Sequence, residues 1–121
     1  MKSLVASLMA ALLAGTAAAS SLPRLKLQPG VTKAQAIKQL NRKINRTAGF
    51  SRADCWLYDG NARIGWRHGA CVGTYTYSGS TSRFKLTVTP ISCSRLRQVV
   101  VVPGEKTQTS IVRWRHETFV C

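Results

Sequence analysis

The sequence predicts an α+β fold in which one N-terminal amphipathic helix packs on a curled antiparallel sheet of four to five strands held by two disulfides. Apolar residues recur at helical spacing only between positions 33 and 48. From Asp54 onward the pattern changes to alternation of apolar and polar residues, which is typical of half-buried strands. A single helix followed by strands favours two layers, with the helix covering one face of the sheet.

The first nineteen residues have the features of a secretory signal peptide. Lys2 gives a positive start, residues 4–15 are apolar, and Ala17-Ala18-Ala19 forms a cleavage pattern. We therefore expect a secreted protein, extracellular or periplasmic, with no transmembrane segment after cleavage. The remaining 20–121 form one domain, in which 20–31 are an extended lead-in and 32–121 the α+β fold.

The helix is predicted over 33–46. Thr32 is a good N-cap, and Gln35 stands three residues later, so the pair fits a capping box. Gly49 offers a stop. The apolar residues at helical spacing are Ala36, Ile37, Leu40, Ile44 and Ala48, and the other faces are basic.

Short strands separated by turn signals are predicted for the rest of the chain. Asp59-Gly60-Asn61 is a hairpin signal after the strand 55–58, residues 67–70 are expected to bend the chain, and Pro103-Gly104 marks a later turn. The remaining predicted strands are 62–66, 71–77, 83–89, 95–102 and 110–121.

The closing stretch 110–121 is predicted to be one core strand. Val112, Trp114 and His116 fall on one side together with Thr118 and Val120, while Phe119 falls on the other. The tryptophans are most simply residues of the core, although a carbohydrate platform is the alternative. They are Trp56, Trp66 and Trp114.

An even number of cysteines in an exported chain predicts disulfides. The four allow three connectivities. Cys93 and Cys121 lie on the basic side of two strands that the turn at 103–106 makes neighbours, so Cys93–Cys121 with Cys55–Cys71 is favoured. No Cys-x-x-Cys pair supports zinc, and we expect neither a metal nor a small-molecule cofactor.

The charge of the chain favours an anionic partner. Lysine and arginine number 18 against four acids, and loss of Lys2 with the signal leaves a net charge of +13. Such an excess favours contact with nucleic acid, cell-wall polymers or an anionic surface, although a merely solvated basic surface is the alternative.

The predicted site is an arginine-rich outer face of the sheet. Guanidinium groups bind phosphate and carboxylate in bidentate fashion, and aromatic side chains between them can stack on bases or sugars. The residues expected on this face, side by side on successive strands, are Arg83, Lys85, Arg95, Arg97, Arg113, Arg115, Tyr75 and Tyr77.

Two other functions are alternatives to this non-enzymatic binding. A small basic ribonuclease would use His68 and His116 as general base and acid. The chain has no catalytic motif of another hydrolase class. A protein-binding or inhibitor module is the other alternative. The helix, sheet and disulfides resemble the cystatin layout, but the glycine of Gln98–Gly104 is displaced from its place in the cystatin loop, so no family is assigned.

Overall fold

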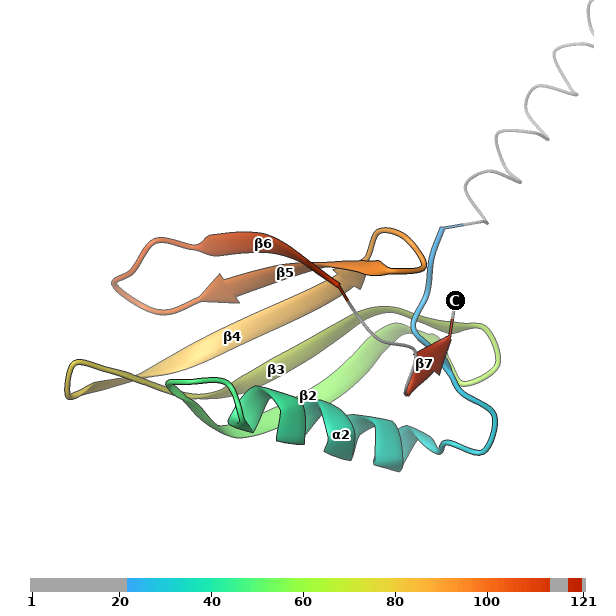
Figure 1. Ribbon diagram of the computed structural model, residues 1–121, viewed down its shortest axis with the longest axis horizontal. Coiled ribbons are helices and arrows are strands. Elements are labelled where there is room, and N and C mark those ends of the chain that lie inside the picture. Colours follow the sequence, from blue (N-terminus) through green and yellow to red (C-terminus); the bar gives the residue numbers. More distant parts are fainter. Residues whose placement is uncertain (1–21, 114–117, 121) are drawn as a thin grey trace, which may run out of the picture.

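The structure, a computed structural model, describes residues 22–113 and 118–120. Its main element is an antiparallel sheet in the order β2-β3-β4-β5-β6, beside which a second sheet pairs β1 with β7 (Figure 1). The one helix among the described residues is α2 (Lys33–Asn45). The strands are β1 (Lys26–Leu27), β2 (Phe50–Asn61), β3 (Gly65–Tyr77), β4 (Ser80–Pro90), β5 (Arg95–Val101), β6 (Gln108–Arg113) and β7 (Phe119–Val120).

Helix α2 begins where the capping box predicted. The Thr32 hydroxyl oxygen accepts a hydrogen bond from the Gln35 backbone N–H at 3.1 Å, and the Gln35 side-chain oxygen accepts one from the Thr32 N–H at 2.9 Å. The helix is not the N-terminal element, however, because β1 precedes it. The lead-in is a strand at this point because its backbone pairs with β7 at the other end of the chain.

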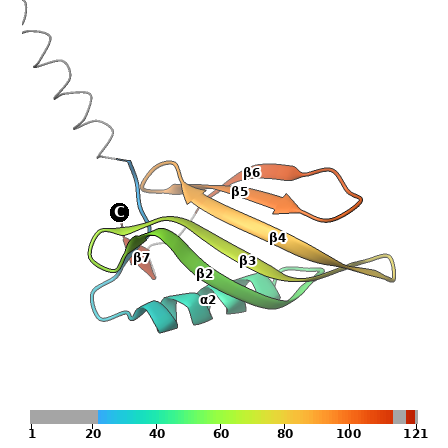
Figure 2. The same ribbon diagram turned by 180° about the vertical axis from the view of Figure 1, so that it is seen from behind.

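One face of the five-stranded sheet, the inner face, packs against α2. The helix lies in front of β2 in Figure 1 and behind it in Figure 2, so it covers one side of the sheet. Ala36 is fully buried at this contact, and Ile37, Leu40 and Ile44 pack against the core. The buried apolar residues of the core are Leu25, Ala36, Cys55, Leu57, Trp66, Cys71, Phe84, Leu86, Val88, Leu96, Val102 and Phe119.

Two asparagines on α2 occupy the open edge of β2. The side-chain oxygen of Asn41 accepts a hydrogen bond from the Cys55 N–H at 2.8 Å, and that of Asn45 accepts one from the Ala53 N–H at 2.8 Å. These N–H groups would otherwise be unpaired donors of an edge strand, which invite pairing with another chain. The helix therefore covers this edge as well as the inner face.

The first hairpin turns later than predicted, and the predicted bend at 67–70 is wrong. Strand β2 continues through Asp59 and Gly60, and the Asn61 side-chain oxygen accepts hydrogen bonds from the N–H groups of Arg63 and Ile64 in the turn. Strand β3 is continuous across Gly69, where a β-carbon would lie 3.0 Å from a Val88 methyl. This glycine allows close packing of neighbouring residues and does not make a turn.

The closing stretch does not form the single strand that was predicted. Strand β6 ends at Arg113 and pairs with β5, whereas Phe119 and Val120 pair with β1 in the other sheet. Phe119, predicted on the outer side, is buried, because pairing with β1 changes which side faces the core. Trp114 and His116 lie outside the described residues.

Of the two predicted disulfides, one joins described residues. Cys55 and Cys71 are bonded, are directly opposite each other on β2 and β3, and are both buried. No described cysteine is a free thiol. The Cys93–Cys121 pair stays a prediction because Cys121 lies outside the described part of the chain. None of the described helices is long and apolar enough to cross a membrane.

Candidate anion-binding face

The outer face is the side of the five-stranded sheet opposite α2, and strand alternation defines its residues. Along β4, Phe84, Leu86 and Val88 are buried in the core, so Arg83 and Lys85 point to the other side. Residues directly opposite each other on neighbouring strands lie on the same face, so the strand register assigns the faces of the other strands as well. The outer-face cations that it identifies are Arg83, Lys85, Arg95, Arg97 and Arg113, all of them exposed.

Three of these cations form an arginine cluster at one end of the outer face. Arg95 on β5 is directly opposite Arg113 on β6, and Arg97 is the next outward residue of β5. Arg97 lies between Thr89 on β4 and Ile111 on β6. Among the described residues, no carboxylate forms an ion pair with the arginine cluster.

Arg83 and Lys85 do not lie beside the arginine cluster, which corrects the predicted arrangement. Lys85 is opposite Val101, and Arg95 is six residues from Val101 along the same strand. A strand rises about 3.3 Å per residue, so the two basic ends of the face are about 20 Å apart. The sequence shows which side of a strand is basic but does not fix the register that places one strand against the next.

Arg83 and Lys85 line a groove of about 580 Å³. Arg52 adds a third cation there, and Asp54 adds a carboxylate. Arg52 has a φ of 53° and lies in an irregularity of the β2–β3 ladder between Ser51 and Asp54. Such a bulge re-aims side chains at the rim of a sheet. The complete lining is Arg52, Asp54, Val72, Gly73, Thr74, Arg83, Phe84, Lys85, Val101 and Pro103.

The predicted tyrosines do not join the outer-face cations. Thr74 pairs with Arg83, so its neighbour Tyr75 points to the inner side, where its ring lies 5.1 Å from the ring of Phe50. Tyr77 has the same parity as Tyr75 and is 65% exposed at the end of the β3–β4 hairpin. Arg115, the remaining predicted residue, lies outside the described part of the chain.

Two aromatic residues that the sequence reasoning did not place on the outer face are exposed there. Trp56 was predicted in the core but is 38% exposed, whereas Tyr58 is 40% exposed. They alternate with the buried Cys55 and Leu57 on β2. The burial of Cys55 in its disulfide was the signal that could have placed Trp56 outside. Trp66, in contrast, is buried as predicted.

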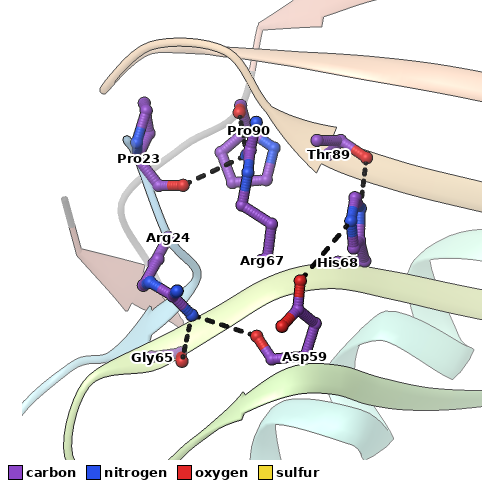
Figure 3. Close-up of polar contacts among 8 residues, drawn as sticks. All are labelled: Pro23, Arg24, Asp59, Gly65, Arg67, His68, Thr89 and Pro90. Atoms are coloured by element: carbon purple, nitrogen blue, oxygen red, sulfur yellow. Dashed lines mark hydrogen bonds and ion pairs between the residues drawn. The ribbon is translucent and has the colours of Figure 1, made fainter. Parts of the chain in front are cut away.

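His68 lies on the outer face in a polar contact with β4. Its Nδ1 is 2.7 Å from the Thr89 hydroxyl oxygen, and its Nε2 is 3.9 Å from an Asp59 carboxylate oxygen (Figure 3). The Tyr58 ring stacks on the imidazole, with centroids 5.0 Å apart. Both ring nitrogens therefore lie near protein groups. The second predicted histidine, His116, lies outside the described residues.

Two other arginines have structural partners. The Arg67 guanidinium donates hydrogen bonds to the carbonyl oxygens of Pro90 at 2.6 Å and Pro23 at 3.2 Å (Figure 3). Arg24 donates to the carbonyl oxygen of Asp59 at 3.0 Å. These arginines tie the segment that contains β1 to the sheet, and their roles differ from those of the outer-face cations.

The described residues contain no group of three or more metal-ligating side chains. No protein-family model, curated protein or solved structure matches the chain.

Proposed function

We propose that this protein is a small secreted, non-enzymatic module that binds an anionic polymer through the outer face, and that single-stranded nucleic acid fits this face best. One observation carries the proposal. The outer face combines exposed aromatic side chains, Trp56 and Tyr58, with basic side chains at two ends about 20 Å apart. A module held by a buried disulfide is compatible with an extracellular location.

The arginine cluster favours an anion over a solvated surface. Arg95 and Arg113 are directly opposite each other on neighbouring strands. Like charges in such positions destabilise a sheet. A phosphate lying across the two guanidinium groups relieves this repulsion and accepts bidentate hydrogen bonds from either. The arrangement is therefore more favourable with a ligand than without one.

The aromatic residues favour nucleic acid over other polyanions. Bases stack on exposed aromatic rings at single-strand binding sites, and each stacked base contributes about 1–3 kcal/mol. The groove beside Arg83 and Lys85 is open to solvent, and a chain-like ligand can enter it. Asp54 in that groove can accept hydrogen bonds from the amino groups of a base.

Fluorescence titration with a 20-nucleotide single strand tests this proposal. Of the two described tryptophans, Trp56 is exposed and Trp66 is buried, so we expect quenching on binding that Trp56→Ala reduces. The variant should also bind roughly 5- to 150-fold more weakly, which corresponds to the stacking energy of one base. No binding at low salt would refute the proposal. Equal binding of heparin, with no change in Trp56 fluorescence, would instead favour a cell-wall polymer or another polyanion.

A further inference from the structure

The solvent side of α2 has a straight row of cations. Lys38 and Arg42 are four residues apart, and Arg46, the C-cap residue, follows after four more. Residues at this spacing lie one above another on a helix, with a rise of about 6 Å per step, so the row spans about 12 Å. All three side chains are exposed. We name Lys38, Arg42 and Arg46 the helix stripe.

The helix stripe has no acidic neighbour on its own helix. The segment 33–45 contains no aspartate or glutamate, and no described residue forms an ion pair with the stripe. Like charges at this spacing destabilise a helix. Lys33, at the start of the same helix, differs because its ammonium lies 5.6 Å from the centre of the Trp66 ring. Arg42 and Arg46 lie at the C-terminal end of the helix, where its dipole favours cations, but no acidic side chain of the described residues pairs with the stripe.

The helix stripe and the outer face point in opposite directions. Helix α2 lies on the inner face of the sheet (Figures 1 and 2). Its apolar side, around Ala36 and Leu40, faces the core, so Lys38 and Arg42 point away from the sheet. The core and the sheet thus separate two cationic surfaces.

We propose that the helix stripe is a second nucleic-acid-binding surface, so that one molecule of this protein bridges two strands. The inference rests on the proposed function of the outer face. The stripe itself has no aromatic residue, so it contacts the phosphate backbone and not the bases. One strand of duplex DNA has a phosphate about every 3.4 Å of axis, so a 12 Å stripe can lie along three or four phosphates of a strand.

Energy transfer between two labelled strands tests the bridging. Equal amounts of a donor-labelled and an acceptor-labelled 20-nucleotide strand are mixed with the full mature protein. We expect transfer with the wild-type protein and at least a fivefold loss with Lys38→Gln, Arg42→Gln and Arg46→Gln combined. Quenching of Trp56 by one strand should change less than twofold, because the outer face is intact. The melting temperature should stay close to the wild-type value, because all three side chains are exposed.

A charge-matched control separates the stripe from net charge. The combined variant Lys26→Gln, Arg63→Gln and Lys106→Gln loses the same charge from three exposed positions in β1 and two turns, so transfer should persist. Transfer that falls equally in both variants, or in neither, would overturn the inference. The inference would also be overturned if the wild-type protein bound with quenching but gave no energy transfer. A stripe variant that kept its energy transfer and lost only binding to anionic vesicles would overturn it too. Failure of the wild-type protein to bind any strand would instead overturn the proposed function.

Discussion

Neutralising the arginine cluster should change how nucleic-acid binding depends on salt. Each phosphate that a cation neutralises on a single strand contributes about −0.7 to the slope of log K against log salt concentration. Alternation places five described, exposed cations on the outer face, and they predict a wild-type slope of about −3.5 if each contacts one phosphate. Replacing Arg95, Arg97 and Arg113 by glutamine should bring the slope to about −1.4.

The assay measures binding of a fluorescent 20-nucleotide strand by anisotropy between about 50 and 200 mM salt, a range over which such contacts weaken strongly. Replacing Arg83 and Lys85 at the other end should remove a smaller part of the slope, about 1.4. Glutamines at Lys26, Arg63 and Lys106 provide the control with matched charge. An arginine-cluster variant with the wild-type slope would refute the assignment of phosphates to this cluster.

Four further predictions concern the fold and the absence of catalysis. Replacing Cys55 and Cys71 by alanine should lower the free energy of unfolding by about 3 kcal/mol, because the disulfide closes a loop between residues 16 apart. A loss below about 1 kcal/mol in a urea titration would contradict this. Gly73→Ala should destabilise the fold by about 1–3 kcal/mol, since the added β-carbon would lie 2.6 Å from a ring atom of the buried Phe84. An unchanged melting temperature in thermal unfolding would count against that packing. Thr32→Ala should cost about 1 kcal/mol through the lost N-cap, measured in the same way. Long incubation should leave RNA intact, and cleavage that His68→Ala abolishes would show that the module is an enzyme.

The sequence predicted features that depend on neighbouring residues. Thr32 and Gln35 start the helix because their hydrogen bonds lie within one turn. The alternation in β4 placed Arg83 and Lys85 opposite the buried Phe84 and Leu86, because a strand turns successive side chains to opposite sides. The basic character of the outer face followed from the same rule.

The errors arose where a residue's environment depends on a distant segment. Asp59 and Gly60 have the composition of a turn, but they continue β2 because their strand pairs with β3 up to Asn61. Trp56 was predicted in the core, but its neighbour Cys55 is buried, so the Trp56 ring points to the other side of the strand. Phe119 is buried because it pairs with Leu27, about ninety residues earlier in the chain.

The candidate site was therefore only partly determined by the sequence. Alternation along each strand identified its described cations, and the anionic ligand that composition favoured stays a prediction. The register between strands decided that Arg95 meets Arg113 while Lys85 meets Val101, and the β2 irregularity brought Arg52 to the groove. Side-chain direction follows from local backbone geometry, whereas register and bulges depend on pairing and packing across the whole sheet. That is why only the tertiary structure showed two basic ends with exposed aromatic residues on the same face.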